Sequence, residues 1–441
     1  MKPNILFFLI DACRADRLYG ENSADTPNID SLIKNGVYFE KNFSSTDYTF
    51  GSLGSILTSE YPFGVGENKQ HYFDIHSTKN NFISHFKKNG YHAYGIMHTF
   101  LNKYGFSFEF ENKDQEYPGS LHIHNGVGDR IIKNIESNEF VEPWFYFMHI
   151  MDLHSPIDVP KEFANESYSK KYNIMLNIID SWIGKIIKKI DMENTLIVIT
   201  ADHGDYIPVT EFNTESAAAV KKSKSMLKKI IPNYFHPYLN RQKYEMVRKV
   251  RKTKLKGSYE KRSLKKRPDE DRYFYDEVIN VPLVFSGYGI NNNRIIKEMV
   301  RSLDIFPTIE DIIQIEEKEN IQGRSLLPLI NGENIEEIPL YMESTIVTTD
   351  QKDPKPVIGI RTSNYKYFRR LHNKKQNVNL YDLKKDPKEE DNLATKMPNI
   401  VLEMEKTLEQ IRDFKTNKSE REISDAQAKE IEDELKKLGY I

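Results

Sequence analysis

The chain has 441 residues, a length that suits one large α/β domain with an appendage, or two domains. Its net charge is −2, and its 39% hydrophobic and 29% charged content is typical of a soluble globular protein. The single cysteine, Cys13, excludes a disulfide framework and a cysteine-based zinc cluster. The apolar run at 5–10 is too short for a signal peptide or a membrane span, so we expect a cytoplasmic protein, at most peripheral to a membrane.

The N-terminal part of the chain alternates short apolar runs with amphipathic stretches. The expected strands are 4–10, 91–97, 144–150 and 195–200, and the expected helices are 27–35 and 170–190. Strands separated by helices predict an α/β fold with a largely parallel sheet, covered by helices on both faces. Ligands bind such sheets at the carboxyl ends of the strands. Asp11 follows the first strand and Asp202 the last, so we expect both residues at that edge.

Residues 206–270 interrupt this alternation, and we interpret them as an insertion. Within it, 221–267 carries 18 Lys and Arg against only Glu245 and Glu260, a net charge of about +16 (18 minus 2). Two interpretations are open: a solvated surface, or a surface that docks onto an anionic polymer or membrane. Nothing else in the sequence indicates base recognition, so we do not expect nucleic acid as a partner.

The pattern changes again toward the C-terminus. A strand is expected at 280–286 and a helix at 302–313, and then four short strands and a closing helix follow at 340–344, 357–361, 365–370, 380–382 and 399–414. A further polar helix is expected at 424–441. This pattern predicts a catalytic α/β domain over 1–335, with the insertion, and over 336–441 a C-terminal subdomain with a small antiparallel sheet and helices.

Four residues form a candidate reactive centre: Asp11, Thr49, Asp202 and His203. Asp and Gly also favour turns and Thr also caps helices, so each residue alone has a purely structural interpretation. Together, two carboxylates, an imidazole and a hydroxyl form a mixed oxygen and nitrogen ligand set. Such a set suits one Mn²⁺ or Zn²⁺ ion better than Ca²⁺, which prefers oxygen ligands alone. A divalent cation can activate a hydroxyl nucleophile and neutralise an anionic ester.

Several segments resemble the sulfatase family of the alkaline phosphatase superfamily, in the same order along the chain. These segments are Pro3–Leu18, Tyr48–Pro62, His149–Pro156, Thr200–Asp205, Tyr275–Leu283, Leu380–Ala394 and Leu438–Tyr440. The resemblance implies an alkaline-phosphatase-like α/β fold and an ester hydrolase or transferase. Thr49 takes the place of the Cys or Ser from which formylglycine sulfatases make their aldehyde, and threonine cannot supply that aldehyde. Leu53 takes the place of an arginine.

The same resemblance implies roles for individual residues. Asp11, Thr49, Asp202 and His203 would bind the metal, as in lipoteichoic acid synthase-type phosphoglycerol transferases, because Ala12 stands where calcium-dependent sulfatases usually have a second aspartate. Thr49 would be the nucleophile, assisted at the substrate by His154 or His149. The other substrate-binding candidates are Arg272, in a region where relatives often have His or Lys, and His98, which follows an expected strand.

We therefore expect a metal-dependent enzyme that attacks a phosphoric ester, polysaccharide- or lipid-linked, and forms a covalent intermediate on Thr49. The first alternative is hydrolysis of a sulfuric ester in the same site, because sulfate and phosphate have similar shapes. The second alternative is a non-catalytic relative that binds an anionic glycan or lipid through its basic insertion.

Overall fold

The computed structural model describes most of the chain outside the basic insertion and the C-terminal tail. The described residues are 2–62, 81–103, 110–137, 139–209, 253, 255, 257–264, 273–290, 292–315, 321–344 and 356–413. Most of the basic block at 221–267, Arg272 and the helix expected at 424–441 therefore lie outside the described residues. None of the described helices is both long and apolar enough to cross a membrane.

A nine-stranded sheet forms the centre of the molecule, in the order β4-β3-β5-β1-β6-β8-β2-β7, with β9 paired to β2. Its strands are β1 Asn4–Ile10, β2 Val37–Phe43, β3 His92–His98, β4 Glu116–Tyr117, β5 Trp144–Ile150, β6 Thr195–Thr200, β7 Asn280–Val281, β8 Leu283–Gly287 and β9 Arg294–Arg301. The strands from β4 to β6 are all parallel, so their carboxyl ends share one edge. β8 runs antiparallel to β6 and to β2, and β9 runs parallel to β2.

β1 lies at the centre of this sheet and is buried along its whole length. Side chains of successive strand residues point to opposite faces. Accordingly, Phe7 and Leu9 belong to one apolar core, and Leu6 and Phe8 belong to the core on the other face. A strand buried on both faces is read in the sequence as a continuous apolar run, which is why β1, β5 and β6 have the predicted bounds.

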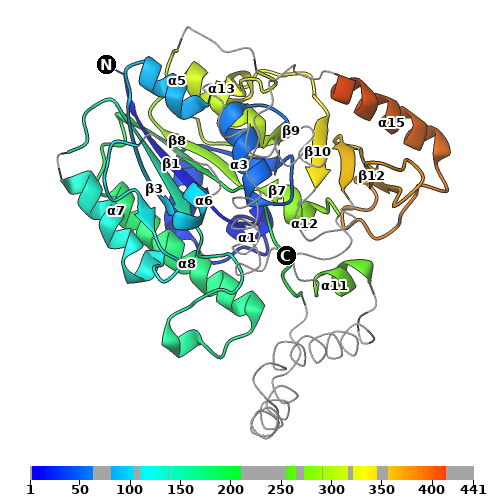
Figure 1. Ribbon diagram of the computed structural model, residues 1–441, viewed down its shortest axis with the longest axis horizontal. Coiled ribbons are helices and arrows are strands. Elements are labelled where there is room, and N and C mark those ends of the chain that lie inside the picture. The colour runs from blue at the N-terminus through cyan, green and yellow to red at the C-terminus, as the bar shows by residue number, and fades with distance from the viewer. Residues whose placement is uncertain are drawn as a thin grey trace, which may run out of the picture.

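Helices cover both faces of the sheet. On the face of Phe7 they are α3 Thr49–Thr58, α5 Phe82–Lys88, α6 Thr99–Lys103, α13 Ile305–Ile312 and α14 Leu327–Asn331. On the face of Leu6 they are α1 Ala15–Leu18, α2 Pro27–Lys34, α7 Val127–Glu136 and α8 Tyr168–Ile187. Figure 1 shows α7 and α8 on one side of the sheet and α5 and α13 on the other.

A second sheet forms the C-terminal subdomain. Its four antiparallel strands are β10 Leu340–Ser344, β11 Val357–Arg361, β12 Tyr365–Arg370 and β13 Asn379–Asp382, and α15 Pro398–Asp413 packs on them. In Figure 1 this sheet and α15 lie to one side of the main sheet, with α12 (Asp276–Ile279) between the two. Between β6 and β7 the structure describes two short helices. α11 (Ser258–Arg262) lies within the insertion, and α12 follows the insertion.

The fold class predicted from the sequence is confirmed: a largely parallel central sheet and a separate small antiparallel sheet. Two features of the main sheet differ from the simple alternation of parallel strands and helices. β2 was not predicted, because Glu40 and Lys41 interrupt its apolar pattern. The strand expected at 280–286 divides into β7 and β8, and β8 is antiparallel to β6 because a hydrophobic run carries no information about strand direction.

Candidate metal and ester-hydrolysis site

Thr49 is the first residue of α3, and its hydroxyl faces the carboxyl end of the main sheet. Tyr48 before it is extended, so the chain passes directly from an extended segment into the helix. Thr49 is completely buried, and its Oγ1 lies 3.2 Å from Asp11 Oδ2 and 3.3 Å from His203 Nε2. The partial positive charge of a helix N-terminus favours negative charge on a group at this position.

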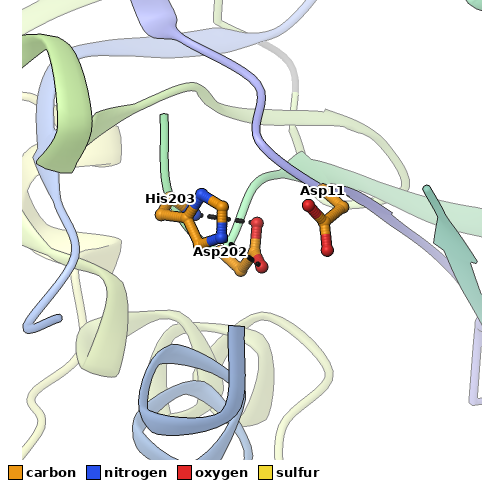
Figure 2. Close-up of side chains that lie close together, drawn as sticks. All are labelled: Asp11, Asp202 and His203. Atoms are coloured by element: carbon orange, nitrogen blue, oxygen red, sulfur yellow. Dashed lines mark hydrogen bonds and ion pairs between the residues drawn. The ribbon is translucent and has the colours of Figure 1, made fainter. Parts of the chain in front are cut away.

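Asp11, Asp202 and His203 come together at the same point. Asp11 follows β1, and its N–H donates to the carbonyl of Ile150 at the end of β5. Asp202 and His203 follow β6, the neighbour of β1 on the other side. One ligand atom from each of the three residues lies within 4.8 Å of the others, and Figure 2 shows the three side chains gathered together. Within the described part of the chain, this is the one cluster of three or more such ligands.

The two carboxylates make this centre electrically unbalanced. Both are completely buried. Burial raises the pKa of Asp202, and the nearby Asp11 carboxylate raises it further. Asp202 Oδ1 accepts hydrogen bonds from the N–H groups of Ala12 and His203, but Oδ2 accepts none from the described residues. A buried oxygen aimed at a second carboxylate and an imidazole fits a divalent cation, which would supply the missing positive charge.

The loop that carries Asp202 and His203 packs closely against α12. Gly204 donates its N–H to the carbonyl of Val278 at 2.7 Å. A Cβ at Gly204 would lie 2.4 Å from the carbonyl oxygen of Glu277, so any larger residue must displace one of the two segments. His203 is oriented by its Nδ1, which lies 2.9 Å from the carbonyl oxygen of Gly204, and its Nε2 is thereby directed to Thr49.

His149 lies at the end of β5, beside Asp11. Its ring is completely buried, Nε2 is 3.5 Å from Asp11 Oδ2, and burial lowers its pKa to about 4, so the ring is neutral at pH 7. Neither ring nitrogen has a hydrogen-bond partner among the described residues. Phe100 packs near the ring, with 6.0 Å between the ring centroids. The structure thus places His149 beside Asp11, at the end of β5.

The remaining predicted residues lie around this centre or outside the described chain. His154 follows β5 in a loop, half-buried, with its N–H donating to Met151. His98 is the last residue of β3; its ring packs on Tyr117 with 5.4 Å between centroids, and a Cβ at Gly119 would lie 3.1 Å from its Nε2. Both therefore lie at the edge that carries the centre. Arg272 lies outside the described residues.

A chain of hydroxyl groups holds the segment before α3. From the sequence, Ser52 was matched to the serine of the family motif, and Ser44 and Thr46 were given no role. Ser52 Oγ lies 2.7 Å from Ser44 Oγ and 2.8 Å from Thr46 Oγ1, and Thr46 in turn donates to the carbonyl of Tyr48. These contacts fix the residue that precedes Thr49. The run of hydroxyl residues Ser44–Thr46, shortly before Thr49, is the sequence signal that could have indicated this hydrogen-bonded cluster. Leu53, in the place of the arginine, is completely buried in the apolar core.

Known proteins share sequence patterns with most of this chain. The profile of the sulfatase family matches residues 3–315, and that of the C-terminal part of N-sulphoglucosamine sulphohydrolase matches 268–414. Arylsulfatase K of Gallus gallus is 28% identical over 155 residues, which is 32% of this chain and 27% of that protein. Delta 4,5-hexuronate-2-O-sulfatase of Bacteroides thetaiotaomicron is 34% identical over 124 residues, 27% of this chain and 25% of that protein. The matched stretches thus span about a quarter of the length of these curated relatives.

Solved structures share the fold over nearly the whole chain. A 2-O GAG sulfatase superposes with a TM-score of 0.64 at 18% identity and covers 95% of both chains. The phosphonate monoester hydrolase of Agrobacterium radiobacter also superposes with a TM-score of 0.64, at 16% identity, covering 93% of this chain and 96% of that one. Because the family profile matches well over half of the sequence, from the first strand through α13, the chain belongs to the sulfatase family.

Proposed function

We propose that the protein is a metal-dependent hydrolase of sulfuric esters and that Thr49 is its nucleophile. The observation that carries this proposal is the position of Thr49 Oγ1, within 3.3 Å of both Asp11 and His203. The family membership favours the sulfate alternative of the sequence analysis over its phosphate interpretation. A relative that is named for a hexuronate 2-O-sulfate and a solved one that is described with a disulfated glucosamine suggest a sulfated sugar as substrate.

The reaction requires a bond from Thr49 Oγ1 to the sulfur atom, while the bond between sulfur and the ester oxygen breaks. The Thr49 hydroxyl loses its proton, and the leaving oxygen takes one up. His154 is our candidate for that proton transfer, because it lies on the loop at the same edge as the centre. Water then attacks the sulfur atom and releases inorganic sulfate, which restores the Thr49 hydroxyl.

Asp11, Asp202, His203 and Thr49 would hold one divalent ion. When bound, such an ion lowers the pKa of a hydroxyl ligand and neutralises charge on the ester. The imidazole in the set, from His203, favours Mn²⁺ or Zn²⁺ over Ca²⁺. We assign His149 a supporting role toward Asp11 in place of a catalytic one, because its buried ring contacts that carboxylate. A bound substrate would approach from the side of Thr49.

The proposal is tested with metal-stripped protein supplied in turn with Mn²⁺, Zn²⁺ and Ca²⁺. Release of p-nitrophenol from p-nitrophenyl sulfate is measured for the wild type and for Thr49→Ala. We expect turnover with Mn²⁺ or Zn²⁺ that disappears in the variant. Equal turnover by Thr49→Ala would refute the role of Thr49, whatever the substrate.

Phosphoric esters are the second candidate substrate, and a specific observation favours them. Thr49 cannot become formylglycine, and its hydroxyl is already in contact with the candidate metal ligands. A hydroxyl nucleophile of this kind suits phosphoryl transfer, the chemistry first expected from the sequence. Bis(p-nitrophenyl) phosphate and p-nitrophenyl phosphate, assayed in parallel, decide between the two esters. If the protein binds metal tightly but turns over none of the three esters, a non-catalytic binding protein is favoured over both enzymatic proposals.

A further inference from the structure

Six charged side chains, five of them buried and Asp276 26% exposed, form a cluster at the junction of three parts of the chain. Three are acidic and three are basic, so their formal charges balance: Asp276, Glu277, Glu389, Arg262, Arg361 and Lys366. Arg262 comes from α11 at the end of the insertion, Asp276 and Glu277 come from α12, and the other three come from the C-terminal subdomain. The ion pairs therefore join α12 to α11 on one side and to the C-terminal subdomain on the other.

Lys366 is the centre of one half of the cluster. Its side chain is completely buried, and its ammonium group contacts Asp276, donates to the carbonyl of Phe274 at 2.6 Å and pairs with Glu389 at 2.7 Å. Arg361 adds a second cation to Asp276, from Nη2 to Oδ2 at 3.0 Å. Glu389 Oε2 in turn accepts the N–H of Asp276 at the start of α12.

Arg262 is the centre of the other half. Its guanidinium binds both carboxylate oxygens of Glu277, at 2.5 and 3.0 Å, and donates to the carbonyls of Lys388 and Glu389. The same group lies over the ring of Tyr275, 3.9 Å from its centroid. A two-oxygen pairing of this type fixes orientation as well as distance. Together, Arg262 and Lys366 hold Glu277 and Asp276, the first two residues of the four-residue helix α12.

α12 is also the surface against which the Asp202–Gly204 loop is packed. Gly204 donates to Val278 and touches the carbonyl of Glu277, as described above. The spacing between α12 and this loop is fixed by backbone contact, so a displaced α12 must move the loop or lose these contacts. The positions of Asp202 and His203 relative to Asp11 thus depend on charges at the subdomain junction.

We propose that this charge cluster positions the Asp202–His203 ligand pair, so that the C-terminal subdomain and α11 set the affinity of the metal site. The inference rests on the proposed metal site. Removing one member of the cluster leaves an uncompensated buried charge. This destabilises the native arrangement and is relieved by movement of the least constrained element. α12, with four residues, is the short element to which these charges attach. Lys366, Arg262 and Arg361 are positioning residues in this scheme.

Lys366→Met is the first test, with Arg369→Met as the matched control. Arg369 lies on the same strand, is equally buried and pairs with Glu405 of α15, away from α12. Binding of Mn²⁺ to metal-stripped, full-length protein is measured by titration calorimetry, and unfolding is measured by circular dichroism. We expect both variants to lower the Tm. Only Lys366→Met should weaken Mn²⁺ binding, by about tenfold, as loss of an outer support does at other metal sites.

A second variant tests the role of charge balance. In Lys366→Met with Glu389→Gln, two acids face two bases, and the glutamine oxygen can still accept the N–H of Asp276. The double variant should recover most of the lost Mn²⁺ affinity. If Lys366→Met does not fold, Arg262→Lys keeps the charge but loses the two-oxygen pairing, and it should still weaken Mn²⁺ binding severalfold.

The outcomes separate this inference from the proposed function. Wild-type affinity in Lys366→Met and Arg262→Lys, with a lowered Tm, would overturn the inference and leave the metal site intact. An equal loss of affinity in Arg369→Met would also overturn it, because the effect would then follow from stability alone. A wild-type protein that binds no Mn²⁺, Zn²⁺ or Ca²⁺ would overturn the metal site itself.

Discussion

Replacement of Gly204 by alanine should disable the metal site while leaving the fold largely intact. The added Cβ would lie 2.4 Å from the carbonyl oxygen of Glu277 and 3.0 Å from Arg14 Cγ. Real Cβ atoms almost never approach within 3.0 Å of another atom, so the loop and α12 must separate by about 0.6 Å, the difference between the two distances. The hydrogen bond from Gly204 to Val278, now 2.7 Å, would lengthen with them.

The expected magnitudes follow from this displacement. Overpacking of this kind costs about 1–3 kcal/mol of the free energy of unfolding. A shift of close to 1 Å in a reacting group can cost about 10²-fold in rate. We therefore expect Mn²⁺ affinity and esterase activity of Gly204→Ala to fall by at least tenfold, measured by titration calorimetry and release of p-nitrophenol. The Tm should fall by only a few degrees.

Gly36→Ala is the matched control. A Cβ there would lie 2.3 Å from the carbonyl oxygen of Phe285, an equally severe overlap, but Gly36 precedes β2, and its neighbours include none of the candidate metal ligands. This variant should lose comparable stability and bind Mn²⁺ normally. Wild-type metal affinity in Gly204→Ala would refute the reasoning, and so would an equal loss of affinity in Gly36→Ala.

Three further predictions address individual side chains. Thr49→Ala should lose at least about 10³-fold in kcat. Thr49→Ser should retain measurable turnover, because only the hydroxyl takes part in bond formation. An alanine variant more active than the serine variant would contradict this prediction. Asp202→Asn should raise the Tm of metal-free protein, because it removes one of two adjacent buried carboxylates, and should abolish Mn²⁺ binding in calorimetry; a lower metal-free Tm would count against the repulsion. Burial raises the pKa of Asp152 to about 7, so the native state retains a proton between pH 4 and 7 that the unfolded state has lost. Stability should therefore decrease as pH rises through this window, by about 4 kcal/mol. Urea unfolding should show this slope flattened in Asp152→Asn but not in Asp158→Asn, whose side chain is 70% exposed.

Several parts of the fold and the site could be predicted from the sequence because their cause is local. Continuous apolar runs determine β1, β5 and β6, which are buried on both faces of the sheet. Because these strands are parallel, the polar residues that follow them must meet at one edge. The sequence alone therefore placed Asp11 and Asp202 together, and the order of motifs around them indicated the family.

Other features depend on contacts between distant segments, and only the tertiary structure decided them. The position of Thr49 at 3.2 Å from Asp11 and 3.3 Å from His203 depends on how α3 packs on the sheet, across 38 and 154 residues of chain. The pairing of Lys366 with Asp276 spans 90 residues, and neither residue differs locally from an ordinary surface charge. Local pattern indicates which apolar residues are buried in a strand, but not that a charged residue such as Lys366 is buried. Long-range packing decides which partner a buried charge or hydroxyl contacts. The local sequence does not decide it, because any residue of opposite charge could pair with the charge, and any polar group could hydrogen-bond to the hydroxyl.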